Sequence, residues 1–173
     1  MCVRLIKIID VIGYSGSGKT HLITNAIKLF KKQLNYNVVV IKNVKHHQID
    51  KEGKDSHKFT ESGAIYSIIK NNANDVGIFL KKKEDNFEEI YDWLQKGPSN
   101  VDLLLTEGFR HMNNPTILCV SKVDDIESQI NENVKLISGI ICSSILNIES
   151  FTEIPILDLE KEFQRFLEIF KIK

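Results

Sequence analysis

Arginine is scarce in this chain of 173 residues, in which only Arg4, Arg110 and Arg165 accompany a large number of lysines. Lysine and arginine together number 23, as do aspartate and glutamate, so the formal net charge is zero. A chain without net positive charge has no overall attraction to nucleic acid or to an acidic membrane surface. We therefore expect neither among its partners, and any binding of anions must depend on local groups of side chains.

Cysteine is also sparse, and no long apolar run opens the chain. Cys2, Cys119 and Cys142 are odd in number, widely spaced and without a C-x-x-C pair. They predict buried thiols of a reduced cytoplasmic protein rather than a disulfide framework. The first twelve residues contain three charged side chains and are too short to span a bilayer. We therefore expect a cytoplasmic protein without a signal peptide.

Apolar runs rich in Val and Ile alternate with segments of helical periodicity. Most of these runs are continuously apolar, which predicts strands buried on both faces. We expect strands at residues 4–12, 38–42, 64–69, 76–80, 101–106, 116–120, 136–142 and 154–157, and helices at 19–34, 86–95, 123–131 and 159–170. Asp158 suits the N-cap of the last helix. The alternation predicts an α/β fold, a mostly parallel sheet flanked by helices, in a single domain over residues 1–173.

Two segments interrupt this alternation. Residues 43–63 are mostly polar and contain glycine, and a connection of this length inside a compact domain is usually functional or mobile. Residues 64–69 and 76–80, joined through the Asn-rich stretch 71–75, predict an inserted β-hairpin. The edges of such a hairpin need covering, and pairing with a second subunit would cover them. We therefore expect a homodimer.

A complete phosphate-binding loop, G-x-x-x-x-G-K-[ST], follows the first expected strand and opens the first expected helix: Gly13-Tyr14-Ser15-Gly16-Ser17-Gly18-Lys19-Thr20. In such a loop the backbone N–H groups and the helix dipole face phosphate oxygens. Lys19 then reaches the β- and γ-phosphates, and Thr20 offers its hydroxyl to Mg²⁺. The flanking strand and helix argue against a chance match. We expect a sheet of the P-loop NTPase type whose phosphate-binding residues are Ser15, Gly16, Ser17, Gly18, Lys19 and Thr20.

A bound nucleotide with Mg²⁺ needs an acidic group at the end of a neighbouring strand. Glu107 ends the apolar run 101–106 and precedes Gly108. Ligands bind at the carboxyl ends of strands in open parallel sheets. We therefore expect Thr20 and Glu107 to hold the metal, with a solvated carboxylate at a strand end as the alternative.

The segment after the second expected strand is rich in cations, with two acidic side chains near them. It should lie beside the phosphates, where its cations can hold a second anionic ligand and Asp50 or Asp55 can help the metal or orient water. A solvated charged loop is the alternative, and adjacent histidines without a Cys or carboxylate at ligand spacing seldom form a zinc site. The cationic candidates are Lys42, Lys45, His46, His47 and Lys54.

Ser121-Lys122-Val123-Asp124 follows the expected strand 116–120 and is similar to the N/T-K-x-D signature with which many GTPases hold guanine. A carboxylate at Asp124 can accept both the N1 and N2 protons of guanine, which adenine cannot match. Lys122 and Asp124 are therefore guanine-binding candidates, and residues 139–144 are expected to supply a strand and a turn that faces the base. A capped helix start at Asp124 or Asp125 is the alternative.

Together these motifs resemble the MobB family, the molybdopterin-guanine dinucleotide biosynthesis adaptor proteins of the P-loop class. The resemblance implies a GTP-binding dimer that assists the MobA-type molybdenum cofactor guanylyltransferase in attaching GMP to molybdopterin, with slow GTP hydrolysis at most. It runs over most of the chain and rests on residues 13–20, Ile41-Lys42 with His46-His47, Asp50-Lys51 with Gly53-Lys54-Asp55-Ser56, Glu61-Ser62-Gly63-Ala64, and Thr106-Glu107-Gly108-Phe109-Arg110.

The chain departs from the family pattern at two positions. His21 stands where a second Thr is usual, just beyond the phosphate contacts, and should be tolerated. Asn43 stands where a His is common after Ile-Lys. The details of the basic loop therefore stay open.

Two other functions remain as alternatives. A small-molecule kinase often places arginines of a mobile lid over the transferred phosphoryl group, and only Arg110 is placed for that, although it also suits a second anion or partner site. A metallochaperone GTPase would deliver a metal through His46 and His47. For hydrolysis, Asp55 is the candidate that positions water.

Overall fold

A computed structural model describes residues 5–80, 87–143 and 149–173 of the chain. Cys2, Arg4, Asn86 and Ser144 lie outside these ranges. The chain divides into two compact units, residues 1–43 with 94–173, and residues 44–93. We call them the sheet unit and the hairpin unit. The single nucleotide-binding domain expected for residues 1–173 stays a prediction.

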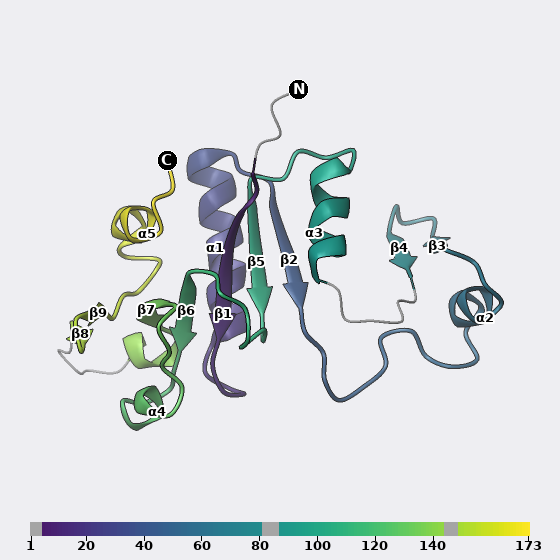
Figure 1. The fold of residues 1–173 in the computed structure, drawn as a ribbon. Helices are drawn as coiled ribbons and strands as arrows, with labels where there is room; N and C mark the ends of the chain where they lie inside the picture. Colours follow the sequence, from purple (N-terminus) through teal and green to yellow (C-terminus); the bar gives the residue numbers. More distant parts are fainter. Residues whose placement is uncertain (1–4, 81–86, 144–148) are drawn as a thin grey trace. The chain divides into compact units, whose positions relative to one another are not determined.

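The sheet unit contains a five-stranded parallel sheet in the order β2-β5-β1-β6-β7 (Figure 1). This confirms the predicted α/β architecture. Its elements are β1 (Lys7–Ile12), α1 (Lys19–Leu34), β2 (Val38–Lys42), β5 (Leu103–Glu107), β6 (Thr116–Cys119), α4 (Asp124–Glu127), β7 (Val134–Ser138), a 3₁₀ turn (Ile140–Ser143), β8 (Ser150–Phe151), β9 (Ile154–Pro155) and α5 (Phe163–Ile169). One further element, α3 (Phe87–Lys96), crosses the boundary between the two units.

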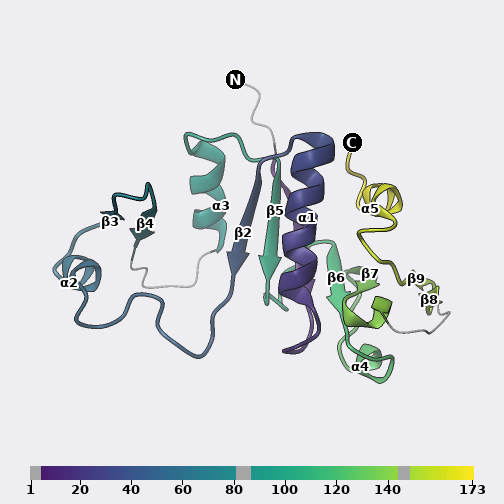
Figure 2. The same cartoon turned by 180° about the vertical axis from the view of Figure 1, so that it is seen from behind.

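Helices cover both faces of this sheet because its strands are apolar on both faces. β5 and β6 are buried at every position. On one face, side chains of α1 and α5 form a core with Ile9, Val11 and Leu103. On the other face, α4 and the 3₁₀ turn contribute to a second core around Ile12 and Leu118. Figure 2 shows the face across which α1 lies.

Parallel pairing places the carboxyl ends of all five strands at one edge. Lys42, the last residue of β2, is the register partner of Glu107, the last residue of β5, and Glu107 is also paired with Val11 of β1. The loop after β1 therefore emerges beside the ends of β2 and β5. This edge is where an open parallel sheet binds its ligands.

The hairpin unit contains α2 (Asp55–Glu61) and an antiparallel hairpin, β3 (Ser67–Lys70) with β4 (Val76–Phe79). The hairpin confirms the prediction. Asn71 closes its turn by accepting hydrogen bonds through Oδ1 from the backbone N–H groups of Ala73 and Asp75, at 2.9 and 3.0 Å. Unlike the strands of the sheet unit, β3 and β4 leave most of their apolar side chains exposed.

Four sequence predictions were wrong in detail. The supposed connection at 43–63 contains helix α2, which the predominantly polar sequence concealed. The expected strand 136–142 ends at Ser138, where Gly139 at φ +97° turns the chain. The expected helix 123–131 is reduced to α4. The last helix begins at Phe163 rather than 159, because Asp158 caps a separate turn through its bond with the Glu160 N–H.

Candidate functional site

The loop between β1 and α1 has the tight packing that close contact with phosphate requires. A Cβ on Gly13 would lie 2.2 Å from the carbonyl oxygen of Cys119 and 2.6 Å from Ser17 Oγ, and the φ of Gly13 is +145°. Only glycine fits there. Ser17 is 2% exposed, and its backbone N–H donates to the carbonyl of Tyr14 at 3.3 Å. The backbone thus curls over itself and leaves a concave surface that a phosphate can enter.

Lys19, in the first turn of α1, reaches back over this loop. Its Nζ donates to the carbonyl oxygens of Gly13 and Tyr14 at 3.0 and 2.7 Å. The ammonium group is therefore already held at the mouth of the loop, where a phosphate oxygen would replace a carbonyl as its acceptor.

Glu107 at the end of β5 is the acidic group expected beside the loop. Its side chain is only 9% exposed, and Oε1 lies 3.1 Å from Nζ of Lys42 at the end of β2. The Lys42 side chain is 54% exposed, so the ion pair is open to solvent on the side of the cation and buried on the side of the carboxylate. A carboxylate and the Thr20 hydroxyl are the hard oxygen ligands that Mg²⁺ accepts alongside phosphate and water.

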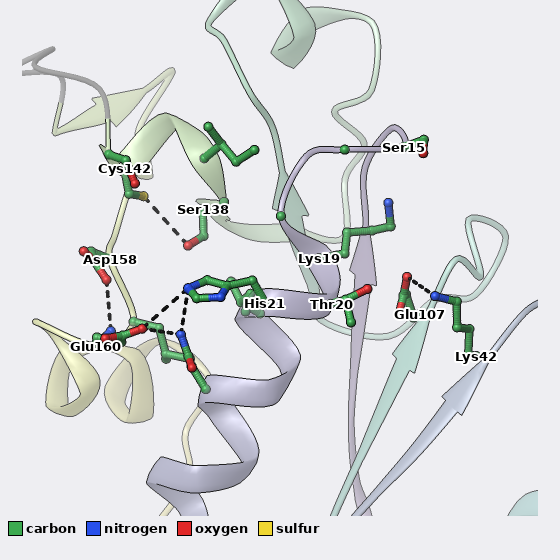
Figure 3. A pocket seen from close by; sticks show the side chains of 18 residues that line it. Ser15, Lys19, Thr20, His21, Lys42, Glu107, Ser138, Cys142, Asp158 and Glu160 are labelled. Carbon is green, nitrogen blue, oxygen red and sulfur yellow. Dashed lines mark hydrogen bonds and ion pairs between the residues drawn. The ribbon is translucent and has the colours of Figure 1, made fainter.

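One cavity of about 760 Å³ joins these groups, and Figure 3 shows its lining. This size lies within the usual range for small-molecule sites. Its walls come from the phosphate-binding loop, from the start of α1, from the 3₁₀ turn and from the turn after β9. The 18 lining residues are Ser15, Gly16, Gly18, Lys19, Thr20, His21, Leu22, Asn25, Lys42, Glu107, Ser138, Gly139, Ile140, Cys142, Ser143, Asp158, Leu159 and Glu160.

The cavity brings together most, but not all, of the predicted phosphate and metal residues. Ser15, Gly16, Gly18, Lys19 and Thr20 line it, as do Lys42 and Glu107. Ser17 lies beneath the loop surface and takes no part in the lining. The residues that sequence reasoning missed are those of the turn at 158–160, which lies about 140 positions after the loop in the sequence.

The predicted guanine residues Lys122 and Asp124 lie elsewhere in the described part of the sheet unit. Neither lines the cavity. Asp124 is the first residue of the short helix α4, but the N-cap position is Val123 and no side chain caps the helix, so the capped start proposed as the alternative is not observed either. Ser121 Oγ instead donates to the Gly16 carbonyl at 3.4 Å, so this segment braces the outside of the phosphate-binding loop.

Arg110 belongs to the same bracing structure. Its guanidinium lies 5.6 Å from the centre of the Tyr14 ring, a cation–π contact, and its Nη2 donates to Oε1 of Gln129 at 2.7 Å. The Tyr14 hydroxyl is 3.3 Å from Oγ of Ser128. Arg110 therefore connects the loop after β5 with the phosphate-binding loop and with the residues following α4.

The other predicted residues belong to the hairpin unit. Lys45, His46, His47 and Lys54 are exposed there. Asp55, the candidate for positioning water, begins α2 and forms an exposed pair with Lys58 at 3.6 Å. Asp50 accepts a hydrogen bond from the Ser56 hydroxyl at 2.7 Å. Their assignment to a second anion or to hydrolysis stays a prediction.

Two properties of the described residues concern a metal site and a membrane span. No group of three or more His, Cys, Asp or Glu residues that could hold a metal occurs within residues 5–80, 87–143 and 149–173. Over the same ranges, every helix is too short or too polar to cross a bilayer. The paired histidines thus lack a third ligand of these types within the described chain.

A phosphate-binding loop between the first strand and first helix of a parallel sheet, facing a carboxylate on the neighbouring strand, defines the P-loop class of proteins. Within this class, the model of the MobB family, "Molybdopterin guanine dinucleotide synthesis protein B", matches residues 8–143. The chain belongs to the MobB family.

Individual relatives agree with this membership. The molybdopterin-guanine dinucleotide biosynthesis adapter protein of Haemophilus influenzae is 34% identical over 115 residues, which cover 65% of this chain and 62% of that protein. A putative adapter protein of the same description from Methanocaldococcus jannaschii is 31% identical over 68% of this chain and 49% of its own length. The chain thus matches less than two thirds of the length of either relative.

Solved structures show the same fold. The crystal structure of Bacillus subtilis MobB superposes with a TM-score of 0.71 at 22% identity and covers 97% of this chain and 99% of that one. The MobB homologue from Bacillus stearothermophilus gives a TM-score of 0.65 at 20% identity, covering 95% and 98%. At such identities the likeness concerns the fold alone.

Proposed function

We propose that this protein is a GTP-binding adaptor that assists a MobA-type molybdenum cofactor guanylyltransferase in attaching GMP to molybdopterin. The observation that supports this best is that Lys19, Thr20 and Glu107 line one cavity in a chain of the MobB family. In this proposal the cavity holds GTP with Mg²⁺, and the protein hydrolyses GTP slowly at most.

In this proposal, different residues of the cavity bind the phosphates and the metal ion. The loop backbone and Lys19 bind the phosphates, and Lys19 exchanges its contacts with the carbonyls of Gly13 and Tyr14 for phosphate oxygens. Thr20 and Glu107 provide oxygen ligands for Mg²⁺, which neutralises phosphate charge when it is bound. Lys42 then leaves Glu107, from which it is 3.1 Å away, and becomes available to a second anion such as the phosphate of molybdopterin.

The arginines favour an adaptor over a phosphoryl-transfer enzyme. A kinase needs a cation that reaches the transferring group in the transition state. Arg110 is engaged by Gln129 and by the ring of Tyr14, and Arg165 pairs with Glu162 at 3.1 Å. Both arginines in the described ranges thus have structural partners, which supports a site that holds a nucleotide rather than one that transfers its phosphate.

The exposed apolar surface of the hairpin unit supports the proposal of a homodimer. Ile68 and Ile78 face each other across β3 and β4 and are 62% and 44% exposed. Ile65 and Val76 are 79% and 57% exposed in the same unit. An isolated two-stranded hairpin is marginally stable in water. Pairing of its edges with a second copy would satisfy the free backbone groups, and packing of its apolar face against that copy would bury these side chains. The free thiols Cys119 and Cys142 support a place in the reducing cytoplasm.

Nucleotide binding is tested by calorimetry with GTP and ATP, with and without Mg²⁺. We expect Mg²⁺-dependent binding that favours GTP, and a loss of at least about a hundredfold in Lys19→Ala, because a charge-assisted contact to each of two phosphates disappears. Lys28→Ala is the matched control, since Lys28 is an exposed lysine of the same helix. Equal affinity for GTP and ATP would contradict the guanine assignment, and an unchanged affinity in Lys19→Ala would contradict the site itself.

The dimer is tested by sedimentation of the wild type and of Ile68→Lys with Ile78→Lys. We expect a dimer for the wild type and a folded monomer for the double variant, because a buried interface does not accept two unpaired charges. Lys70→Glu, a charged change at the end of the same strand, controls for charge alone. A wild-type monomer at high concentration would refute the dimer.

The adaptor role is tested by binding to a MobA-type guanylyltransferase with and without GTP. We expect capture of that enzyme by the wild type, and weaker capture by the Lys19→Ala variant when GTP is present. No binding under either condition would refute the role in GMP attachment while leaving the nucleotide site in place.

A further inference from the structure

A single parallel β-bridge extends the sheet beyond β7. Ile156 forms a parallel bridge with Ile137 of β7, and the Leu157 N–H donates to the Ile137 carbonyl at 3.0 Å. Because this segment runs parallel to β7, it ends at Asp158 on the same edge of the sheet as the phosphate-binding loop. In an open parallel sheet the loops at this edge are those that contact the ligand.

The turn after β7 lines the same cavity as Asp158 and is fastened to the phosphate-binding loop. The Ile140 N–H donates to the Ser17 carbonyl at 3.2 Å. A Cβ on Gly139 would lie 2.4 Å from that same carbonyl oxygen, so the two segments pack too closely for any other residue. Ile140 and Ser143 thereby form a fixed wall of the cavity next to the loop.

The charges along the cavity give a bound nucleotide a direction. Lys19 and Lys42 lie at the end that contains Thr20 and Glu107, whereas Asp158 and Glu160 lie at the other end, with His21 between the two (Figure 3). Phosphates are attracted to the lysines and repelled by the two carboxylates. A nucleotide seated on the loop would therefore point its base toward Asp158 and Glu160.

The two carboxylates differ in what already engages them. Oε1 of Glu160 accepts a hydrogen bond from Nδ2 of Asn25 and lies 3.7 Å from Nε2 of His21. Asp158 is the more buried, with its side chain 31% exposed, and Oδ1 is oriented by the Glu160 N–H at 3.1 Å. Its other oxygen is 3.1 Å from the ammonium of Lys161, which is 75% exposed. Since a carboxylate offers about four acceptor positions, Asp158 keeps capacity for a ligand.

We propose that Asp158 is the residue that reads the base in this cavity. Its carboxylate accepts the adjacent N1–H and N2–H donors of guanine, a pair that adenine lacks. This inference rests on the proposed binding of a nucleotide to the phosphate-binding loop. In this proposal Asp158, which follows the bridge at Ile156, selects the base. Asp124 does not, because it lies outside the cavity lining.

The substitution Asp158→Asn tests the assignment, because it should change the preferred base from guanine toward xanthine. The amide offers a donor in place of an acceptor, so it suits the C2 carbonyl of xanthine and no longer both donors of guanine. We expect GTP affinity to fall at least about tenfold and xanthosine triphosphate affinity to rise, measured by calorimetry with Mg²⁺. A gain of affinity for xanthosine triphosphate cannot come from loss of folding.

Two matched variants complete the test. Asp124→Asn makes the same chemical change at the position that the sequence favoured, and Glu160→Gln makes it on the neighbouring carboxylate of the cavity. We expect both to keep the wild-type ratio of GTP to xanthosine triphosphate affinity. An unchanged ratio in Asp158→Asn, or a reversed ratio in either control, would overturn the assignment.

Failure of the proposed function gives a different result. If the wild-type protein binds neither triphosphate, or if Lys19→Ala binds both as well as the wild type does, the phosphate-binding loop is not the nucleotide site and both proposals fall. If binding depends on Lys19 but Asp158→Asn leaves base preference unchanged, only the assignment of Asp158 falls.

Discussion

The sheet unit and the hairpin unit use similar apolar sequences with opposite outcomes. Leu103–Glu107 is buried at every position of β5, whereas three of the four residues of Ser67–Lys70 are exposed in β3. The difference lies in what covers the strands. β5 has a parallel neighbour on each side, and its Leu103 and Leu105 belong to the core. In contrast, β3 has only β4 as its strand partner within the described chain.

This comparison separates two kinds of surface. The sheet unit has its own core and needs no other molecule to hold its phosphate-binding loop in place. The hairpin unit leaves large apolar side chains on its surface, an arrangement that marks sites of protein–protein contact. The cavity of the sheet unit and the exposed apolar side chains of the hairpin unit are the two features on which the proposed adaptor function depends.

The largest expected effect comes from replacing one phenylalanine of each unit by alanine and comparing the loss of stability. Phe30 is fully buried and packs against Phe163 and Phe166, with ring centres 5.1 and 6.0 Å away. We expect Phe30→Ala to lower the free energy of unfolding by about 3–5 kcal/mol. Phe59 is 54% exposed, so Phe59→Ala should cost less than about 1 kcal/mol in dilute solution. Urea denaturation measures both, and equal losses would show that Phe59 is as buried as Phe30.

Alanine substitutions at two glycines, one in each unit, compare how tightly the backbone of each unit is packed. Gly139 and Gly53 have similar positive φ angles, +97° and +88°, but a Cβ would meet the Ser17 carbonyl only at Gly139 and nothing within 4 Å at Gly53. Both alanine substitutions introduce the same left-handed strain. We expect Gly139→Ala to destabilise the protein by about 1–3 kcal/mol more than Gly53→Ala, since it also overpacks. It should also weaken nucleotide binding, because the wall at Ile140 is displaced from the loop.

Thermal unfolding and GTP titration of the two variants measure these effects. Similar losses for both would mean that the turn after β7 moves away from the phosphate-binding loop without cost. That result would remove the argument that this turn is a fixed wall of the cavity.

The smallest expected effect is the pH dependence of stability caused by Asp10, a buried acidic residue of the sheet unit. The described residues of the hairpin unit contain no buried acidic side chain. Asp10 in β1 is 1% exposed, and it accepts hydrogen bonds from Thr106 at 2.6 Å and from Asn114 at 3.3 Å. Burial raises the pKa of Asp10 above its ordinary value, and the hydrogen bonds only partly oppose this shift. The folded protein therefore retains this proton at a pH at which the unfolded chain has lost it.

The sign of the pH dependence follows from this difference in protonation. As pH rises from the ordinary carboxyl pKa to the raised folded value, Asp10 makes unfolding progressively easier. We expect the stability difference between the wild type and Asp10→Asn to shift against the wild type over this window and to become constant above it. Urea denaturation from pH 3 to pH 7 measures it. A difference that moves in favour of the wild type would show that the hydrogen bonds outweigh burial.

Much of the fold could be predicted because its signals are local. The bounds of α1 and β2 agree with the sequence prediction, since a phosphate-binding loop fixes the start of one and an apolar run defines the other. Helix α2 was missed because six of its seven residues carry polar side chains, its one apolar residue, Phe59, is exposed, and its only buried residue is Ser56. A short helix with so little apolar surface leaves no periodic pattern to detect.

The site shows the same division. Lys19, Thr20 and Glu107 could be placed from the sequence, because each is defined by its position relative to one strand. Asp124 could not be told apart from a helix start by four residues of sequence, and the structure places it at the beginning of α4. Asp158 was interpreted as a helix cap, and its place in the cavity became visible only with the bridge between Ile137 and Ile156.

The sequence by itself determined the phosphate-binding loop, most of the strands and helices of the sheet unit, and the inserted hairpin, because these depend on neighbouring residues and on the periods of 3.6 and 2. Only the tertiary structure decided which strands are buried, that Lys42 pairs with Glu107, and that Asp158 shares a cavity with Lys19. These facts depend on which segments lie side by side in the sheet. Backbone hydrogen bonds between distant segments determine that order, and the sequence does not record it locally.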